Sequence, residues 1–587
     1  MLKKIGLGLM SFSELRESNS YYIDKTSFIK DIMNESIKSF LFTRPRRFGK
    51  TLTQSMLNDF LCLNYGNSPD HAKKQLCLFE DLEISKDKEF CQEQMGRHPV
   101  IFISFKNIEQ PTYEGMRAAL IRMVRDLYSS FYFLTQTDSL NKLQIASFEE
   151  FATISNHNDT VNVDELITSS LISLCKTLCT VYKRKVIVLI DEYDVPVNKA
   201  QSYGFYDKIL PLLRGMLYQV VKDDRQLVEK CVITGCNRIS RESIFTGMNS
   251  AIVYSVSDGM YSDIFGFTQA EVDELLHYYS LTSKKDTVKE WYDGYNFGGT
   301  CIYNPWDVTN YCYALLKNSE AEPVNYWANT SSNEIIKEFI DYADPPSLEK
   351  MQKLLNCETI KTRIDEQLVY PDLEKDHSPI QLFSILLSSG YLTAISVDHE
   401  GYELKIPNRE IKVLFNDLVT SFYQSSDTRF HASAAELPKI MAEGFSGPLE
   451  DQINYLLSRF ISVRDTGYEI AYHTFFVGVL SQVLPPSARL LSEPEAGDRF
   501  ADITFMMNKS TGIILEFKKG NSDSELERLA VQAIKQAEKR KYRNIFSDYP
   551  VKKIITYGIA CHGKRAVVKS SVSSVPKISI RVLTLYF

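Results

Sequence analysis

The first 270 residues alternate short apolar runs with longer stretches of helical periodicity. Five of the runs have the length and composition of buried strands: SFLFT at 39–43, HPVIFISF at 98–105, KVIVLIDE at 185–192, KCVITG at 230–235 and AIVYSV at 251–256. Short apolar runs of this kind, separated by helices, are typical of a parallel sheet that helices cover on both faces. The pattern therefore predicts an α/β domain over residues 1–270.

Helical periodicity continues from residue 271 to 380, for example in the segments TQAEVDELLHYYS and SSNEIIKEFIDYA. The turn-rich stretch WYDGYNFGGTCIYNPWD interrupts it. We interpret residues 271–380 as a helical lid region.

Residues 381–439 have a different order of elements. A helix ends at Gly390, two alternating strands follow around the turn 398–401, and a second helix comes next. Helix, hairpin and helix in this order resemble a winged-helix element. Such an element either binds DNA or, when fused to an ATPase, serves as a packing or gating module, and we favour the second role.

The pattern becomes α/β again over residues 440–587. Two helices and a strand precede the hairpin RFADITFMMNKSTGIILEFKK, which is followed by the long helix SDSELERLAVQAIKQAEKRKYRNIF and a further strand. This order predicts a separate C-terminal domain.

Composition places the chain among soluble globular proteins. Of its 587 residues 44% are hydrophobic and 24% charged, and no run approaches the roughly 18 apolar residues of a membrane span. The eleven cysteines include no C-x-x-C pair, which argues against a zinc ribbon or a disulfide framework. We expect a reduced, cytoplasmic protein.

Charge is distributed unevenly along the chain. The net charge is −7, yet residues 496–587 hold 17 Lys and Arg against 8 Asp and Glu. A basic segment on an acidic chain indicates a site for a polyanion such as nucleic acid. The alternative is a solvated helix face, since the run KQAEKRKYR supplies much of the excess.

Phosphate-loop chemistry is suggested by the segment IKSFLFTRPRRFGKTLTQS at 37–55. Gly49, Lys50 and Thr51 fit the second half of the pattern G-x-x-x-x-G-K-[ST], while Arg44 occupies the place of its first glycine. A lysine at this point neutralises the β- and γ-phosphates of a nucleotide, and we add Arg47 as a further candidate in the loop.

Two further strand ends carry candidate residues for the same site. Asp191 follows a buried apolar run, where it is expected to hold Mg²⁺ together with Thr51, and Glu192 is expected to orient the attacking water. The strand at 230–235 ends in polar residues: Thr234 or Asn237 is a candidate γ-phosphate sensor, and Arg238 a candidate for meeting the developing charge.

These motifs together resemble a family of AAA-ATPase-like proteins widespread in bacteria. The resemblance covers about residues 5–320 through YYIDKTSFIKDI, FTRPRRFGKTLTQSMLNDF, VIVLIDEYDVPV, ITGCNRISRESIFTGMN, IFGFTQAEV and YDGYNFGG. Members carry the loop RPRRFGK[ST], so an arginine at position 44 is a family feature. The resemblance implies that Lys50, Thr51, Asp191 and Glu192 form the nucleotide site.

The hairpin near residue 500 carries a second set of candidates. Side chains alternate along a strand, so Glu516 and Lys518 share a face while Phe517 points to the core. Counting back through the turn places Asp502 opposite residues 516–518. Two carboxylates and a lysine therefore converge, and such a group can hold one or two Mg²⁺ ions against a phosphodiester.

This arrangement resembles the PD-(D/E)xK nuclease superfamily over about residues 440–587, with Ala501 in place of the usual proline. The resemblance implies that Asp502 and Glu516 are metal ligands and that Lys518 positions the water or stabilises the phosphate. A glutamine on the following helix is assigned to Gln536, by spacing, in preference to Gln532. His473 and Glu493 are further candidates.

We therefore expect a P-loop AAA-like ATPase, with a helical and a winged-helix-like region, followed by a PD-(D/E)xK nuclease-like α/β domain. The expected cofactors are ATP and Mg²⁺, the expected partner is nucleic acid, with DNA favoured, and a homo-oligomer is an additional expectation. The competing hypothesis is a nucleotide-dependent switch or assembly protein whose nuclease-like domain binds a partner or nucleic acid without cutting.

Overall fold

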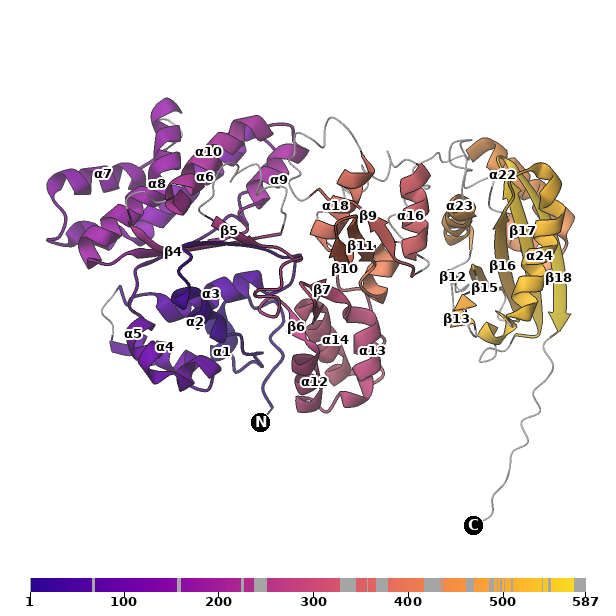
Figure 1. Ribbon diagram of the computed structural model, residues 1–587, viewed down its shortest axis with the longest axis horizontal. Coiled ribbons are helices and arrows are strands. Elements are labelled where there is room, and N and C mark those ends of the chain that lie inside the picture. The colour runs from indigo at the N-terminus through magenta and orange to yellow at the C-terminus, as the bar shows by residue number, and fades with distance from the viewer. Residues whose placement is uncertain are drawn as a thin grey trace, which may run out of the picture. The chain divides into compact units, whose positions relative to one another are not determined.

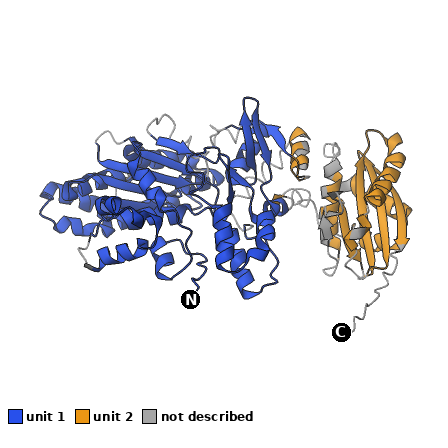
Figure 2. Ribbon diagram, turned by 60° about the horizontal axis from the view of Figure 1, so that its bottom comes forward, with its two compact units in different colours: residues 1–332, 359–414 blue, residues 333–358, 415–587 orange. Residues whose placement is uncertain are grey.

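The chain folds into two units, coloured blue and orange in Figure 2: unit 1 holds residues 1–332 and 359–414, and unit 2 holds residues 333–358 and 415–587. The computed structural model describes residues 2–65, 69–155, 160–222, 226–236, 251–327, 345–355, 357–365, 378–415, 434, 436–460, 469–484, 490–492, 495–496, 499–500, 502–507, 510–540, 542–546 and 551–574.

A five-stranded parallel sheet forms the centre of unit 1, with the strand order β2-β3-β4-β1-β5. All five predicted strands are present: β1 Ser39–Thr43, β2 Val100–Ser104, β3 Val186–Asp191, β4 Val228–Gly235 and β5 Ala251–Tyr254. Strands β1 and β3 are buried at every position, as their unbroken apolar runs predict. Because β1, β3 and β4 are parallel, their carboxyl ends meet at one edge of the sheet.

Helices cover both faces of this sheet (Figure 1). One group lies below the sheet in Figure 1: α1 Phe12–Glu17, α2 Ser27–Asn34, α3 Lys50–Leu61, α4 Pro69–Phe79 and α5 Lys88–Gln94. The other group lies above it: α6 Tyr113–Ser130, α7 Lys142–Ala152, α8 Thr160–Tyr182, α9 Val195–Ser202 and α10 Tyr206–Lys222. The predicted doubly covered sheet is therefore confirmed.

The part of unit 1 that we interpret as a lid combines helices with a small sheet that the sequence pattern did not show. Its helices are α12 Gln269–Tyr278, α13 Lys285–Tyr292 and α14 Pro305–Lys317, which share one apolar core. Its strands are β6 Phe267–Thr268, β7 Tyr295–Phe297 and β8 Thr300–Tyr303, in the order β6-β8-β7. Gly298 and Gly299, at φ 52° and 96°, form the two-residue turn that joins β7 to β8.

The predicted helix, hairpin and helix follow. Helix α18 Pro379–Ser389 ends at Gly390 with φ 88°, β10 Thr393–Asp398 pairs with β11 Gly401–Lys405, and residues 409–415 are helical. Strand β9 Ile360–Thr362 adds a third strand beside β11. The hairpin tip is acidic, with Asp398 and Glu400 both paired to Lys361.

Unit 2 is built on the mixed sheet β12-β15-β16-β17-β18, in which only β16 and β17 run parallel. The strands are β12 Leu490–Ser492, β15 Ile503–Met507, β16 Thr511–Lys519, β17 Lys553–His562 and β18 Arg565–Ser574, and β13 Glu495–Ala496 pairs separately with β14 Arg499–Phe500. The helices are α16 Pro345–Leu355, α21 Leu437–Glu443, α22 Ser446–Phe460, α23 Glu469–Val483 and α24 Leu526–Lys539.

Helix α24 lies very close to strand β17, and glycine makes this approach possible. A Cβ atom on Gly558 would lie 2.1 Å from the carbonyl oxygen of Ala530. The opposite face of the sheet packs on α21, α22 and α23 in a separate apolar core. Strand β16 is thereby covered on both faces, so the charged residues at its carboxyl end stand at the border of a dry interior.

No disulfide joins any of the eleven cysteines, all of which belong to the described residues. Within the described part of the chain, no helix has both the length and the apolar character needed to cross a membrane.

Candidate active sites

The predicted phosphate loop connects β1 to α3, and Gly49 stands at the start of the helix in the left-handed conformation, at φ 83°. Lys50 turns its ammonium back onto the loop. Its Nζ donates to the carbonyl oxygens of Arg44 and Pro45, at 2.9 and 2.8 Å, and to Cys236 Sγ at 3.2 Å. The loop thus holds a buried cation beside a helix N-terminus, the arrangement that attracts phosphate groups in proteins.

At the end of β3, the carboxylate of Asp191 accepts hydrogen bonds from two hydroxyl groups. Thr51 Oγ1 donates to its Oδ2 and Thr234 Oγ1 to its Oδ1, each at 2.7 Å. The side chain of Gln54, which the sequence analysis missed, donates to Thr234 Oγ1 and to two carbonyls of neighbouring strands. Thr51 and Asp191 offer the oxygen ligands that Mg²⁺ prefers, so these residues fit that ion.

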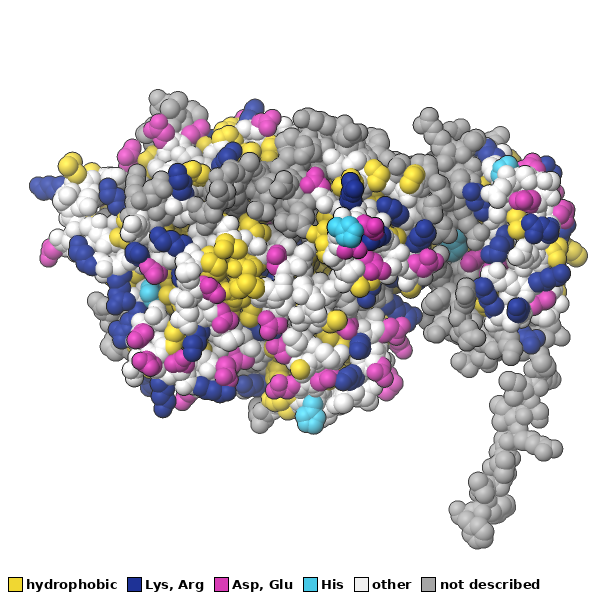
Figure 3. Space-filling model, in the orientation of Figure 1, with side chains coloured by type: hydrophobic (Ala, Val, Ile, Leu, Met, Phe, Trp, Pro, Cys, Tyr) yellow, Lys and Arg dark blue, Asp and Glu magenta, His cyan; other side chains and the backbone are white. Residues whose placement is uncertain are grey.

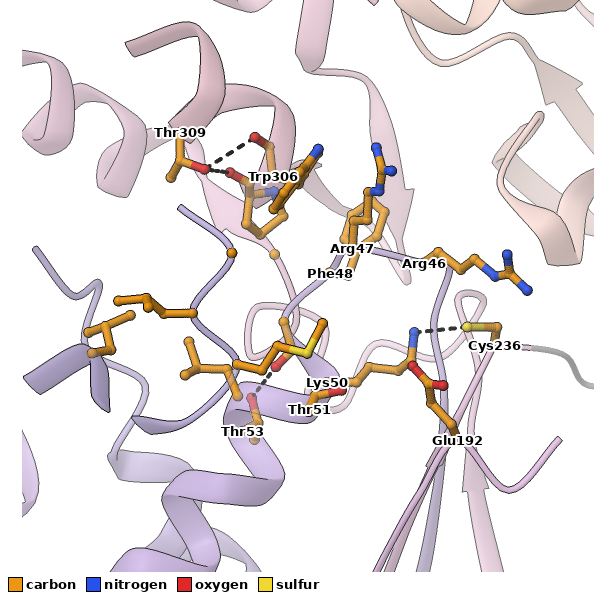
Figure 4. A pocket seen from close by; sticks show the side chains of 18 of the residues that line it. Arg46, Arg47, Phe48, Lys50, Thr51, Thr53, Glu192, Cys236, Trp306 and Thr309 are labelled. Carbon is orange, nitrogen blue, oxygen red and sulfur yellow. Dashed lines mark hydrogen bonds between the residues drawn. The ribbon is translucent and has the colours of Figure 1, made fainter. Parts of the chain in front are cut away.

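Glu192 follows at φ 52° and lines the same cavity as Lys50 (Figure 4). Burial raises the pKa of this carboxyl group above its ordinary range, and the charge of Asp191 raises it further. A raised pKa brings a carboxylate nearer to the proton affinity that a general base needs. Asp194 lies close by, but both of its oxygens accept the Cys236 N–H, at 3.3 and 3.2 Å.

The remaining candidates of the nucleotide site are placed unequally. Thr234 lies beside Asp191, as given above, whereas Asn237 and Arg238 lie outside the described residues. Arg47 does line the cavity, yet its guanidinium lies 5.0 Å from the ring centroid of Trp306 and donates to the carbonyl of Tyr326. A nucleotide-binding role for Arg47 stays a prediction.

A cavity of about 590 Å³ opens beside the loop. Its lining combines polar residues of the loop and Glu192 with apolar side chains of more distant segments: Ile5, Leu9, Tyr21, Ile23, Phe267 and Trp306. Sequence reasoning did not find this apolar part of the lining, because it is assembled from segments that lie far apart in the chain.

Arg44 occupies the place of the first glycine of the usual loop pattern, and its contacts account for this difference. Its side chain is completely buried, and burial lowers its pKa to about 10. The guanidinium donates to the carbonyl oxygens of Thr43, Tyr254 and Tyr261, at 3.1, 2.9 and 3.4 Å, and stacks near the ring of Phe297 at 5.2 Å. Arg44 therefore fastens the loop to β5 and to the lid.

Replacing Arg44 by glycine, which restores the usual loop pattern, is expected to destabilise unit 1 by about 3 kcal/mol or more. Buried carbonyl groups would lose their donor, and each such loss costs about 1–3 kcal/mol. Urea unfolding followed by tryptophan fluorescence measures this, since Trp291, Trp306 and Trp327 all belong to unit 1. Wild-type stability in the glycine variant would contradict the structural role.

In unit 2 the strand register brings the second set of candidates together. Ile503 pairs with Leu515, so one further step along the hairpin sets Asp502 opposite Glu516. Asp502 Oδ2 accepts the backbone N–H of Phe517 at 2.7 Å. Phe517 points into the core, where it stacks on Phe476 with centroids 5.3 Å apart.

Glu516 is the most strongly perturbed group of this site. Only 1% of the residue is exposed; Oε1 accepts a hydrogen bond from Gln536 Nε2 and lies 3.7 Å from Lys518 Nζ. Its other oxygen, Oε2, is buried and has no hydrogen-bond partner among the described residues. Burial, followed by the charge of Asp502, raises the pKa of Glu516 to about 8.

A divalent cation fits this arrangement. Two close carboxyl groups, one with a buried oxygen in need of a partner, are stabilised by a positive charge between them. Within the described residues no group of three His, Cys, Asp or Glu side chains converges, so the candidate metal site consists of Asp502 and Glu516. Oxygen ligands of this kind suit Mg²⁺.

The other candidates in unit 2 lie around this pair. His473 Nε2 is 3.0 Å from the carbonyl oxygen of Asp502, and Glu493 lies outside the described residues. Arg540, which the sequence analysis did not single out, lowers the pKa of Glu516 through its charge and donates to Tyr542 Oη at 3.0 Å. Gln536 donates a hydrogen bond to Glu516, whereas Gln532 on the same helix is exposed.

The raised pKa of Glu516 predicts a pH-dependent stability of metal-free unit 2. The group binds its proton more tightly in the folded than in the unfolded state, so its contribution to stability is fully present below pH 4.5 and is lost as pH rises toward 8. The loss is on the order of 5 kcal/mol. Hydrogen exchange of β16 and β17 in the whole chain measures it. Glu516→Gln should remove the dependence, and an unchanged pH profile in that variant would contradict the assignment.

Comparison with known proteins identifies two domains in the chain. A family model described as "Predicted AAA-ATPase" matches residues 6–245, and a model of the "PD-(D/E)XK nuclease superfamily" matches residues 467–571.

Two individual proteins show weaker likeness. A protein of Azotobacter chroococcum mcd 1, described as "Uncharacterized protein in vnfD 5'region", is 27% identical over 429 residues, which cover 72% of this chain and 70% of the relative. The Walker-type ATPase PABY2304 of Pyrococcus abyssi aligns with 68% of this chain and 97% of its own, at 13% identity and a TM-score of 0.35. With the two family models and the geometry above, this chain combines an AAA-ATPase-like domain at residues 6–245 with a C-terminal PD-(D/E)XK nuclease superfamily domain at residues 467–571.

Proposed function

We propose that unit 1 binds ATP together with Mg²⁺ and hydrolyses it. The observation that carries this proposal is one cavity lined both by Lys50, Thr51 and Glu192 and by an apolar surface. The charged side chains at the start of α3 suit the phosphates, and the apolar side chains of the lining suit the base. A volume of about 590 Å³ is sufficient for a nucleotide.

In this cavity Lys50 neutralises charge on the β- and γ-phosphates, and Glu192 orients a water and accepts its proton. Thr51, which also lines the cavity, and the buried Asp191, to which Thr51 donates a hydrogen bond, would hold the magnesium ion. The bound Mg²⁺ supplies charge neutralisation of the phosphates. The eleven cysteines, none of them in a disulfide, fit our proposal of a cytoplasmic location.

We further propose that unit 2 cleaves phosphodiester bonds of DNA, and that ATP in unit 1 regulates this cleavage. Asp502 and Glu516 would hold Mg²⁺, which activates water for attack on phosphorus. Lys518 stands 3.7 Å from Glu516 Oε1, near enough to hold the water or the phosphate, and Gln536 orients the glutamate. Foreign or mobile DNA is the substrate that the combination of an ATPase with a nuclease suggests.

Basic side chains near the site support binding to a polyanion. Lys and Arg gather on the face of unit 2 seen in Figure 3, and Arg528, Lys535 and Lys539 are exposed along α24, the helix that carries Gln536. Phosphates held by such residues release counterions, so affinity falls as salt rises.

Reversing the charge of Lys535 and Lys539 to glutamate is therefore expected to weaken DNA binding by about tenfold or more at low salt and to flatten its salt dependence. Fluorescence anisotropy between 50 and 200 mM salt, about the range over which such contacts weaken, measures both. The matched control reverses Lys88 and Lys142, two exposed lysines of unit 1. Equal losses in the two double variants would assign the effect to net charge alone.

A second candidate function is a nucleotide-dependent switch whose nuclease-like unit binds without cutting. The observation that favours it is the small ligand set, since two carboxylates are the whole acidic cluster among the described residues of the site. Plasmid cleavage with Mg²⁺, with and without ATP, separates the two functions. Wild type should cleave the plasmid, and the effect of ATP on cleavage should be absent in Lys50→Ala. If wild type binds DNA but does not cleave it, the switch function is supported instead.

A further inference from the structure

The chain passes from unit 1 into unit 2 at two places, after residue 332 and after residue 414. The segments that precede these two exits are tied together inside unit 1. Glu410 Oε1 accepts the backbone N–H groups of Tyr326 and Trp327, at 2.6 and 2.9 Å. Glu410 is completely buried and Trp327 is 1% exposed. We call Tyr326, Trp327 and Glu410 the exit clasp.

The side chain of Arg47 connects the phosphate loop to the exit clasp. Arg47 Nη1 donates to the carbonyl oxygen of Tyr326, so this peptide segment is held by Glu410 on one side and by Arg47 on the other. The guanidinium also lies over the ring of Trp306 at the start of α14 (Figure 4). Asp307, the next residue, is buried beside Glu410, and the charge of Arg47 acts on both carboxyl groups.

Other residues of the loop pack against the same part of unit 1. Phe48 contacts Tyr295 with ring centroids 5.0 Å apart. Pro45 touches Gly390, at the end of α18, so closely that a Cβ on this glycine would lie 3.0 Å from Pro45 Cβ. Trp327 of the exit clasp packs edge-on against Tyr391, the neighbour of Gly390, at 5.0 Å. A movement of the loop would therefore displace residues of the exit clasp.

A nucleotide gives Arg47 a competing partner. Arg47 stands two residues before Gly49, and a guanidinium binds phosphate oxygens more strongly than a neutral carbonyl or an aromatic ring. The loop holds Arg47 at φ 70°, a conformation that a non-glycine residue adopts only when its surroundings impose it. Phosphate binding would offer the side chain a second stable position.

We infer that Arg47 transmits nucleotide occupancy from the phosphate loop to the exit clasp, and through it to the two segments that lead into unit 2. Without nucleotide, Arg47 braces the carbonyl of Tyr326 and the clasp is closed. With nucleotide, Arg47 turns to the phosphates and the clasp loosens. This inference rests on the proposed binding of ATP, and it names the residues by which the ATP site would regulate unit 2.

Hydrogen exchange followed by mass spectrometry tests the inference on the whole chain, with and without ATP and Mg²⁺. In wild type, ATP should protect the peptide 49–54 and should speed exchange about tenfold in the peptides 320–327 and 405–415, where the clasp loses its brace. In Arg47→Ala, at ATP concentrations that protect 49–54 fully, the exit-clasp peptides should exchange fast already and show no further response.

Two variants of Glu410 provide the control. Glu410→Met removes the acceptor and should open both exit-clasp peptides without ATP, while Glu410→Gln keeps an acceptor oxygen and should retain the response to ATP. A retained response in Arg47→Ala, or protection of 49–54 in wild type with no change at the exit clasp, would overturn the inference while leaving ATP binding intact. Absence of protection at 49–54 in wild type would instead reject ATP binding, and the inference with it.

Discussion

Glu192→Gln is expected to bind ATP and to hydrolyse it about 10²–10⁴-fold more slowly than wild type, the usual contribution of a general base. The amide keeps the size and the hydrogen-bonding capacity of the side chain but cannot accept a proton from water. Lys50, which contacts the phosphates in our proposal, and Thr51 and Asp191, which would hold the magnesium ion, are unchanged in this variant. Calorimetry with ATP and a phosphate-release assay measure binding and turnover separately.

Two matched variants make this result specific. Lys50→Ala removes the ammonium that neutralises the phosphates and should abolish measurable ATP binding. This variant therefore loses ATP binding, whereas Glu192→Gln loses turnover. Asp194→Asn tests the neighbouring carboxylate, whose oxygens are engaged by the Cys236 N–H. Full turnover in Glu192→Gln together with loss of turnover in Asp194→Asn would move the base to Asp194. Unchanged ATP binding in Lys50→Ala would reject the phosphate-loop assignment.

The second large effect is expected in unit 2, where substitutions of four side chains should have three different consequences. Asp502→Ala and Glu516→Ala each remove one of two metal ligands, so both metal binding and DNA cleavage should be lost. Lys518→Ala should keep metal binding and lose about 10²–10³-fold in rate, the usual value of one transition-state contact. Gln536→Ala should have a smaller effect than Lys518→Ala, because a neutral amide acts only by orienting Glu516.

Calorimetric titration with Mg²⁺ and single-turnover cleavage of linear and circular DNA separate these effects. Gln532→Ala is the matched control for Gln536→Ala, since it changes the same residue type on the same helix at an exposed position. If Lys518→Ala lost metal binding as completely as Glu516→Ala, the lysine would be maintaining the site and not acting in the reaction.

Strand positions in this protein were predictable because local chemistry determines them. The run VIVLI is long and apolar enough to predict a buried strand, and alternation along the hairpin was enough to set Glu516 and Lys518 on one face and Phe517 in the core. Counting through the turn placed Asp502 opposite residues 516–518, and the strand register of the structure narrows this range to Glu516. These features depend on neighbours in sequence, which a pattern can represent.

The parts that the sequence did not predict depend on contacts between distant segments. Arg44 fills the place of a glycine because carbonyls of β5 and of residue 261 surround it, and no local pattern contains them. Arg47 faces Trp306 and Tyr326, more than 250 residues away in the chain. The small sheet of the lid was overlooked because its strands are only two to four residues long, although the Gly298-Gly299 pair is a recognisable hairpin turn.

The central claim is that one chain carries an ATP site and a metal-dependent centre that cuts DNA. The most direct measurement is the cleavage of supercoiled plasmid by wild type and by Glu516→Ala, purified in parallel and assayed with ATP and with either Mg²⁺ or EDTA. We predict that wild type cuts only with Mg²⁺ and that Glu516→Ala leaves the plasmid intact. Equal cleavage by the two proteins, or cleavage by wild type in EDTA, would contradict the claim.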